Sequence, residues 1–348
     1  MTTDQGEMTH TTGEAGVTSS SSRVAALYFE CFVVVIGVIG TAANGLVLYA
    51  LLASKQHKKH ELIVNQNVLD LCGCLFLILT YGLKLSNMKL SGSLGYWLCM
   101  LILNESLLIG GVSASWLNLI IIAIERYLRV IHPIWSKKHL RTWMIKASMA
   151  IAWIAGFVQQ IASGFETSVV INGVCYGYVI WKSPETALAA TLYYVFVTYF
   201  IVVVIFMFCY GKILMAIRRQ SRVMASPNTA GSRSHQTQSH IKIQSDVIKT
   251  MILVCTFFAV AWLPEKIYVV LMSMNPNLTL LDGGYCVILF LGFLYICINL
   301  VIINHKTLCE CCQLNLYYLR RAQRGHSFSI SAPTRLSMPQ SSMQLDAS

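Results

Sequence analysis

The chain has 348 residues, of which 55% are hydrophobic and only 12% are charged, and its formal net charge is +11. A soluble domain carries about 25% charged residues, so the composition excludes an ordinary soluble protein and indicates a chain that crosses a membrane several times. The positive charge does not indicate nucleic-acid binding, because Lys and Arg cluster in short loops between apolar runs.

Seven segments each hold the roughly 20 mostly apolar residues that a membrane-spanning helix needs. They are 27–53, 62–83, 97–124, 143–164, 187–214, 247–273 and 284–304. The pattern predicts an all-α membrane protein, a seven-transmembrane helix bundle occupying 27–304. The polar segment 1–26 has no basic region typical of a cleavable signal peptide and is predicted to be a disordered extracellular tail.

The basic residues predict the orientation of the seven spans. With the N-terminus outside, the inner loops and tail hold 21 of the 26 Lys and Arg. Cytoplasmic loops carry such an excess of positive charge, so the sequence predicts an extracellular N-terminus and a cytoplasmic C-terminus.

The chain after the last span divides into two parts. Residues 305–321 are predicted to form a short amphipathic juxtamembrane helix, and 322–348 a disordered cytoplasmic tail. Cys309, Cys311 and Cys312 lie on this amphipathic segment, where S-palmitoylation is a plausible modification. The alternative is that all three remain reduced thiols.

Asp70 lies in the middle of the second span. A carboxylate at that depth costs roughly 2.5–3.5 kcal/mol on insertion scales, so a functional role is expected. Asn44, Ser115 and Asn299 lie at similar depth in other spans, and the four side chains together would suit a hard cation or a proton. The alternative is a hydrogen-bonded network that only holds the helices together.

The tripeptide Glu125-Arg126-Tyr127 ends the third span. An arginine at a cytoplasmic helix end is ordinary, and the glutamate beside it could merely neutralise it. The tripeptide therefore carries little information by itself. Its place after the third span and before Ile131-His132-Pro133 makes it informative.

Pro264 interrupts the sixth span, two residues after Trp262. Proline removes one backbone hydrogen bond and kinks a helix. A bulky indole near a kink can couple a cavity on one side to helix movement on the other. The alternative is a packing aromatic beside an incidental kink.

Two features are predicted on the extracellular side. Cys99 at the outer end of the third span and Cys175 in the next outer loop face an oxidising compartment, so a disulfide is expected. Asn277 lies in an Asn-Leu-Thr glycosylation sequon in the third outer loop.

These residues together resemble the rhodopsin-like (class A) G protein-coupled receptors over roughly residues 25–320. The matching positions, in chain order, are Asn44, Asp70, Cys99, Ser115, Glu125, Arg126, Tyr127, Trp153, Cys175, Tyr210, Phe258, Trp262, Pro264 and Asn299. Any one match is weak, whereas their order and their assignment to spans are jointly specific.

The resemblance implies a cell-surface receptor in the plasma membrane, not an enzyme, which passes an extracellular signal to heterotrimeric G proteins. Glu125, Arg126, Tyr127 and Tyr210 would serve G protein coupling, and Phe258, Trp262, Pro264 and Asn299 the activation switch. Asn44, Asp70, Ser115 and Asn299 would hold an allosteric sodium ion, with no other cofactor. Further expected partners are arrestin, receptor kinases and membrane lipid.

The chain departs from the family pattern at several positions. Ile303 replaces the tyrosine that would reach Tyr210, and Val202 replaces the proline of the fifth span. Cys99 is two residues further from Arg126 than is typical, which predicts a bulge or a longer third helix. These changes put ordinary ligand-switched activation in doubt.

The sequence restricts the chemical class of the ligand. Leu108 stands where amine receptors carry an aspartate, and Phe293 where opsins carry the retinal lysine, so a peptide or another non-amine ligand is favoured. Glu105, Glu265 and Lys266 are expected near the mouth of the pocket, where they would meet a polar ligand or the lipid headgroups. The rival function is an ion or solute transporter that uses Asp70.

Overall fold

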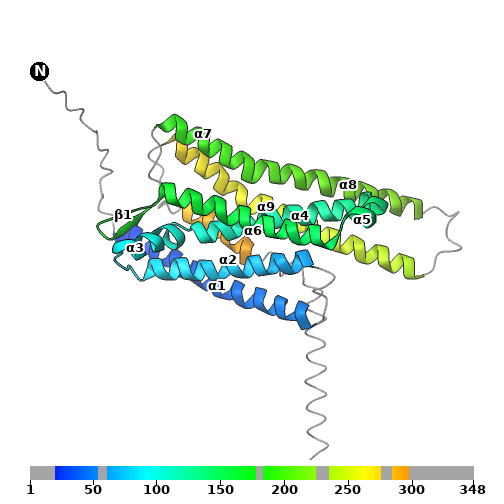
Figure 1. Ribbon diagram of the computed structural model, residues 1–348, viewed down its shortest axis with the longest axis horizontal. Helices are drawn as coiled ribbons and strands as arrows, with labels where there is room; N and C mark the ends of the chain where they lie inside the picture. Colours follow the sequence, from blue (N-terminus) through cyan, green and yellow to red (C-terminus); the bar gives the residue numbers. More distant parts are fainter. Residues whose placement is uncertain (1–19, 54–60, 178–182, 225–234, 276–283, 298–348) are drawn as a thin grey trace, which may run out of the picture. The chain divides into compact units, whose positions relative to one another are not determined.

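The computed structural model describes residues 20–53, 61–177, 183–224, 235–275 and 284–297, all within one compact unit, Met1–His305. Figure 1 shows the described elements. They are α1 (Ser20–Ala53), α2 (Glu61–Leu85), α3 (Gly92–Leu98), the π-helical turn η2 (Cys99–Leu103), α4 (Ser106–Ile131), α5 (Pro133–His139), α6 (Thr142–Thr167), β1 (Val169–Ile171), β2 (Val174–Tyr176), α7 (Pro184–Val195), the π-helical turn η3 (Phe196–Phe200), α8 (Ile201–Met224), α9 (His235–Met274) and a helix over Gly284–Cys297.

Within the described ranges, six helical stretches are long and apolar enough to cross a membrane, and they match the first six predicted spans. The shorter apolar helix Gly284–Cys297 matches the beginning of the seventh. The predicted seven-helix bundle is therefore confirmed. One boundary differs, because α1 begins at Ser20 inside the segment predicted as a tail. Extending a helix that already exists fixes one residue per added hydrogen bond, so a polar first turn can continue an apolar helix.

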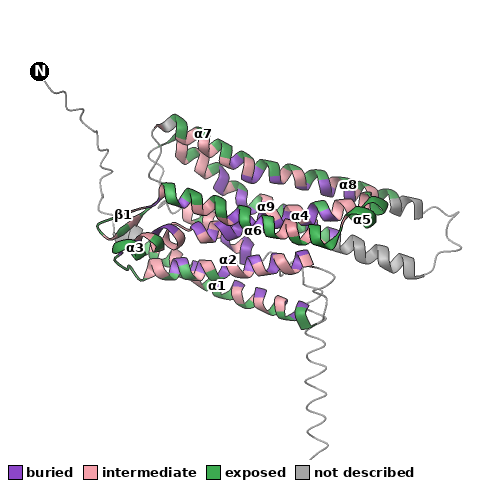
Figure 2. Ribbon diagram, viewed as in Figure 1, coloured by how far each residue is buried: buried purple, intermediate pink, exposed green. Residues whose placement is uncertain are grey.

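The third span lies between several neighbours. Helix α4 packs against α2, α6 and α8, while α1 packs on α2 and α7 packs on α9. Buried residues concentrate on the faces that meet inside the bundle, as Figure 2 shows. Ile151, Ile154 and Val158 of α6 are apolar but exposed, which is the outward surface that a lipid bilayer would cover.

Two spans contain π-helical turns. In the third span η2 is followed by Glu105, whose backbone is left-handed with φ 61°, so the span bends before α4 begins. The predicted irregularity near Cys99 is therefore confirmed. In the fifth span η3 ends two residues before Val202, which stands where the family has a proline. This span therefore has an irregular turn without that proline. Such turns occur frequently at functional sites.

The segment between α6 and α7 contains a small β-hairpin, which was not predicted. Strands β1 and β2 pair antiparallel, with Val170 opposite Cys175. Asn172 and Gly173 form the turn with positive φ angles of 53° and 79°. Asn-Gly between β-branched residues is a strong hairpin signal, so the sequence did contain the information.

Candidate functional site

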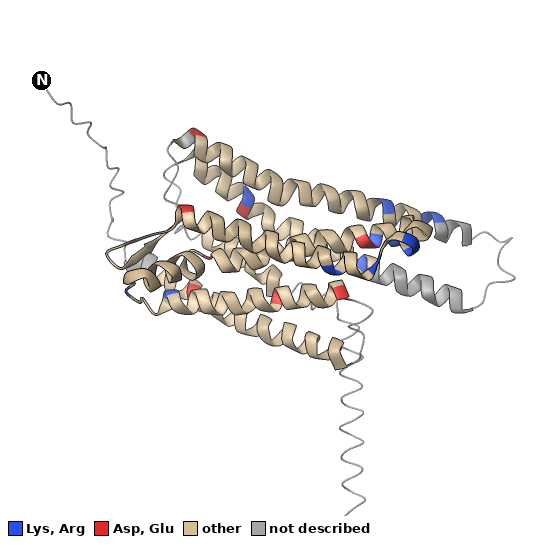
Figure 3. Cartoon of the chain, in the orientation of Figure 1, with Lys and Arg blue, Asp and Glu red and all other residues tan. Residues whose placement is uncertain are grey.

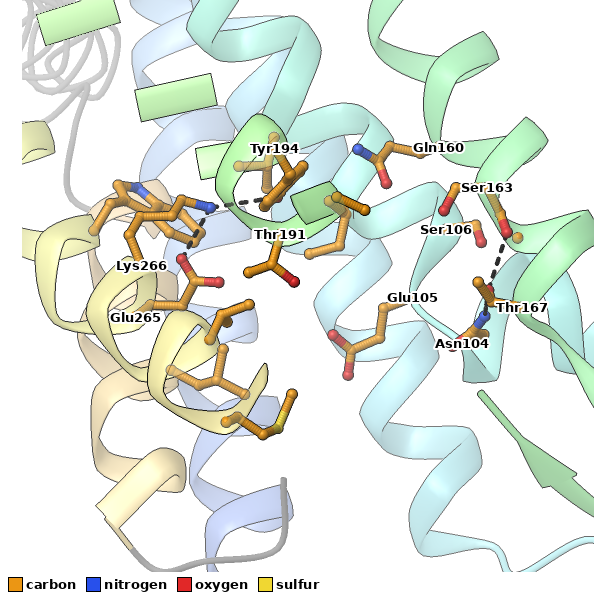
Figure 4. Close-up of a pocket in the computed structure, with 18 of the residues that line it drawn as sticks. Asn104, Glu105, Ser106, Gln160, Ser163, Thr167, Thr191, Tyr194, Glu265 and Lys266 are labelled. Carbon is orange, nitrogen blue, oxygen red and sulfur yellow. Dashed lines mark hydrogen bonds and ion pairs between the residues drawn. The ribbon is translucent and has the colours of Figure 1, made fainter. Parts of the chain in front are cut away.

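A cavity of about 550 Å³ lies between the third span, α6, α7, α9 and the helix Gly284–Cys297. We call the end of the bundle that holds this cavity and Cys99 the disulfide end. Its wall is apolar for the most part, with hydrogen-bonding side chains from several elements that converge on it, as Figure 4 shows. These are Asn104, Ser106, Gln160, Ser163, Thr167 and Thr191. Small-molecule and peptide sites have this mixture of apolar wall and few placed polar groups.

Glu105 carries one of the charges of the cavity wall. The Lys84 ammonium lies 2.5 Å from its Oε1 atom, and the Tyr81 hydroxyl donates a hydrogen bond to the same oxygen at 2.9 Å. The left-handed backbone at Glu105 places this carboxylate in the bend of the third span. Its charge is therefore compensated from α2 in this structure.

Lys266 carries a positive charge in the cavity wall and is only 2% exposed. Its Nζ atom lies 2.9 Å from a carboxylate oxygen of Glu265 and donates a hydrogen bond to the Tyr194 hydroxyl at 3.3 Å (Figure 4). A buried charge is costly unless it is paired and hydrogen-bonded, and both conditions are met here. Lys266 was expected near the pocket mouth, but it lies buried in the wall.

Lys266 also contacts two aromatic side chains, Trp116 and Trp262, which line the cavity themselves. Its ammonium lies 5.2 Å from the ring centroid of Trp116 and 5.7 Å from that of Trp262. Cations are attracted to the face of an indole at such distances. A ligand that moves Lys266 would therefore act directly on both indoles.

The predicted activation residues Phe258 and Trp262 lie in one buried cluster with Trp116 of α4. The Trp116 ring contacts Phe258 at 5.6 Å and Trp262 at 5.3 Å, both edge to face. Pro264 lies within α9, whose carbonyl at Ala259 accepts a hydrogen bond of 2.8 Å from the Tyr199 hydroxyl. This bond ties α9 to the fifth span one residue before the carbonyl that the proline leaves without its usual donor. Asn299 lies outside the described residues.

Asp70 and Ser115 of the predicted ion site are in contact. The Ser115 hydroxyl donates to Asp70 Oδ1 at 2.9 Å, and both residues are buried. Asn44 turns its amide to the Cys74 thiol at 3.5 Å. Gln66 was not predicted, and its side chain lies against both Asp70 and Ser115. Its position four residues before Asp70, on one helix face, was the available signal.

Glu125 forms ion pairs with two arginines at the opposite end of α4. Arg126 Nε lies 3.4 Å from its carboxylate without hydrogen-bond geometry, while Arg129, one turn later, is in closer contact with it. Glu125 is buried and Arg129 is half-exposed. Arg129 was not predicted, although its i, i+4 spacing from Glu125 indicated the pair. The Tyr127 hydroxyl lies 3.5 Å from His132 Nε2.

Lys and Arg gather at this end of the bundle, as Figure 3 shows. We call it the basic end, and its described members include Lys137, Lys138 and Arg141.

Tyr210 is buried on α8 near the basic end, and its side chain is close to the Cys255 thiol of α9. The family pattern has a tyrosine at position 303 as the partner of Tyr210, but this sequence has Ile303 there. In this structure a residue of the sixth span provides a partner instead.

The structure joins Cys99 and Cys175 in a disulfide, which fixes β2 to the third span. A backbone hydrogen bond of 2.9 Å from Leu90 to Gly173 holds the hairpin turn as well. The hairpin therefore covers the bundle beside the cavity. Asn277, Cys309, Cys311, Cys312 and the predicted helix 305–321 lie outside the described residues.

The bundle has a cavity at the disulfide end and, at the basic end, Glu125 paired with Arg126 and Arg129; we call these three residues the arginine clamp. A seven-helix bundle with these two sites is typical of a transmembrane receptor. The model of the rhodopsin family of seven-transmembrane receptors matches residues 43–302, and the chain belongs to that family. It is therefore a multi-pass membrane protein.

The chain is similar to three curated receptors at low identity. It is 24% identical to the substance-P receptor of Cavia porcellus over 55% of this chain and 48% of that receptor. It is 22% identical to somatostatin receptor type 3 of Mus musculus over 72% of this chain and 58% of that receptor. It is also 22% identical to the substance-K receptor of Homo sapiens over 78% of this chain and 67% of that receptor. The matched region spans about half the length of the first of these relatives. None of them is a transporter by name, so the transporter hypothesis gains no support.

Proposed function

We propose that this chain is a plasma-membrane receptor, with its N-terminus outside, that passes the signal of an extracellular peptide to heterotrimeric G proteins. The observation that carries the proposal is the position of Lys266. It forms part of the cavity wall and lies over the two indoles of the buried aromatic cluster. One side chain of the helix that carries Pro264 thus reaches from the cavity wall to Trp116 of α4.

A peptide ligand suits the chemistry of the cavity. The hydrogen-bonding side chains of its wall would meet backbone amides, and its volume suits the terminal segment of a peptide. Glu105 and Glu265 each have a lysine partner, so a charged ligand group would have to compete for one of these pairs. The relatives are named as receptors for substance P, somatostatin and substance K, which supports the same ligand class.

The clamp at the basic end would transmit the signal. A ligand shifts the receptor only by binding the active arrangement more tightly than the resting one. Movement of α9 would change the Tyr210–Cys255 contact, and release of Arg126 from Glu125 would free it for a G protein α-subunit. Arrestin, receptor kinases, lipid contacts, glycosylation at Asn277 and palmitoylation after the last span remain predictions.

A nucleotide-exchange assay tests the proposal. The full chain in lipid nanodiscs is mixed with a panel of purified α-subunits, alone and with substance P, substance K, neuromedin K or somatostatin. We expect accelerated exchange on at least one α-subunit, and at least about a tenfold loss with Arg126→Ala, equivalent to about 1.4 kcal/mol. Arg141→Ala, an exposed arginine of the same end, is the control. Equal exchange by the wild type and Arg126→Ala would contradict the proposal.

A further inference from the structure

A chain of side-chain hydrogen bonds crosses three helices and ends at Asp70. It begins at Trp153 of α6, whose indole N–H donates to Asn65 Oδ1 of α2 at 3.0 Å. Asn65 Nδ2 then donates to Asn118 Oδ1 of α4 at 2.9 Å, and Asn118 Nδ2 donates to Gln66 Oε1 of α2 at 2.9 Å. Gln66 and Asn118 are both 0% exposed, so bulk water does not compete for the bond between them.

The last link is the amide of Gln66. Its Nε2 atom donates to Asp70 Oδ1 at 3.0 Å and to Ser115 Oγ at 2.5 Å. Ser115 Oγ itself donates to Asp70 Oδ1 at 2.9 Å. The amide nitrogen therefore lies within hydrogen-bond distance of oxygens from two of the four residues that the resemblance assigned to a sodium ion, Asp70 and Ser115.

The orientation of each amide in this series of hydrogen bonds follows from groups that can only donate or only accept. An indole N–H can only donate, so the oxygen of Asn65 must face Trp153 and its nitrogen must face Asn118. A second fixed group leads to the same result, because Asn118 Nδ2 also donates to the Leu62 carbonyl oxygen at 3.1 Å, and a carbonyl can only accept. The oxygen of Gln66 must then face Asn118.

A cation and the Gln66 amide would compete for one place. Both bring positive charge to Asp70 Oδ1 and Ser115 Oγ, and the amide hydrogens already occupy the space between those atoms. Turning the amide over would set its oxygen against the carboxylate and its N–H groups against those of Asn118. Each of these contacts would leave buried polar groups unsatisfied. The residues present therefore do not fit a sodium ion.

We propose that the Gln66 amide takes the place of the sodium ion at Asp70, so that this protein does not bind sodium at this site. Of the other two residues that the resemblance assigned to the ion, Asn44 has an oxygen without a hydrogen-bond partner in the part of the chain that the structure describes, and Asn299 lies outside that part. One neutral oxygen does not replace the contacts that the amide takes. The consequence is a bundle core that is insensitive to sodium concentration.

Thermal unfolding of the purified full-length chain in sodium chloride and in choline chloride at equal ionic strength tests this proposal. We expect equal unfolding midpoints for the wild type. Gln66→Leu removes the amide at similar volume, and we expect its midpoint in sodium chloride to exceed that in choline chloride by about 2 °C or more, as selective ion binding would produce. Gln66→Met, which keeps the length of the side chain, serves as a second variant. The double variant Gln66→Leu/Asp70→Asn should lose the sodium response.

Three results would overturn the proposal: a sodium response of the wild type, no sodium response of either Gln66 variant, or a response that survives in the double variant. The measurement requires no G protein. Its outcome is therefore independent of whether the proposed signalling function holds.

Discussion

Lys266 shows how one residue can connect a cavity to the interior of a helix bundle. Its ammonium is held by Glu265 and Tyr194 and lies over two indoles. The sequence indicated that Lys266 lay near the ligand site, since it follows Pro264 in the sixth span. It could not show that the lysine points into the wall, because this direction depends on how α9 is rotated against α4 and α7.

Replacing Lys266 tests this buried pair. Lys266→Met leaves the Glu265 carboxylate buried without its partner, and breaking such a pair costs about 3–5 kcal/mol of stability. Thermal or denaturant unfolding of the purified protein would measure the loss. The double variant Glu265→Gln/Lys266→Met should lose less than Lys266→Met alone, and Lys89→Met, at an exposed position, should be neutral. A single variant as stable as the wild type would contradict the pairing.

Helices α4 and α6 approach closely at Gly156. A Cβ atom at this position would lie 2.5 Å from the backbone nitrogen of Ala114 and 2.8 Å from its Cα atom. Small residues allow such contacts between membrane helices. The close approach also brings Trp153, three residues earlier on α6, to Asn65 at the start of the hydrogen-bond chain.

Gly156→Ala should therefore separate the two helices. Backbone atoms cannot yield as a flexible side chain can, so we expect a loss of about 1–3 kcal/mol, measured by thermal unfolding. Gly82→Ala on α2 is the control, since no atom lies within 4 Å of its added Cβ and alanine favours a helix. Equal stability of Gly156→Ala and the wild type would show that α4 and α6 are not packed as described.

Much of the element order could be predicted from the sequence because apolar length alone identifies a membrane span. The irregular turn near Cys99 was also predictable, from the distance between Cys99 and Arg126. The turn η3 was not, because Val202 removed the proline that would have indicated it. The hairpin was missed although Asn172-Gly173 indicated it, since the expectation of an all-α protein left no place for strands.

At the scale of the whole molecule, the sequence identified most residues of the two functional ends but not their cross-helix partners. Asp70 and Ser115 were predicted to meet. Gln66 was missed although it lies four residues before Asp70 on one helix, and its contacts with Ser115 and Asn118 of α4 depend on helix rotation and register. The partner of Tyr210 likewise came from α9 rather than from the last span. Local spacing predicts neighbours on one helix, and packing determines the rest.

In the proposed mechanism, Glu125 restrains Arg126 at the basic end until a ligand acts at the disulfide end. Nucleotide exchange by the ligand-free chain carrying Glu125→Gln tests it most directly, because the change removes the charge that holds Arg126 and Arg129. Glu61→Gln, which weakens the separate contact with Lys146, is the matched control. We predict that Glu125→Gln raises basal exchange severalfold, that Glu61→Gln leaves it unchanged, and that adding Arg126→Ala abolishes the increase. Basal exchange that stays at the wild-type level in Glu125→Gln, or an increase that survives the loss of Arg126, would contradict the claim.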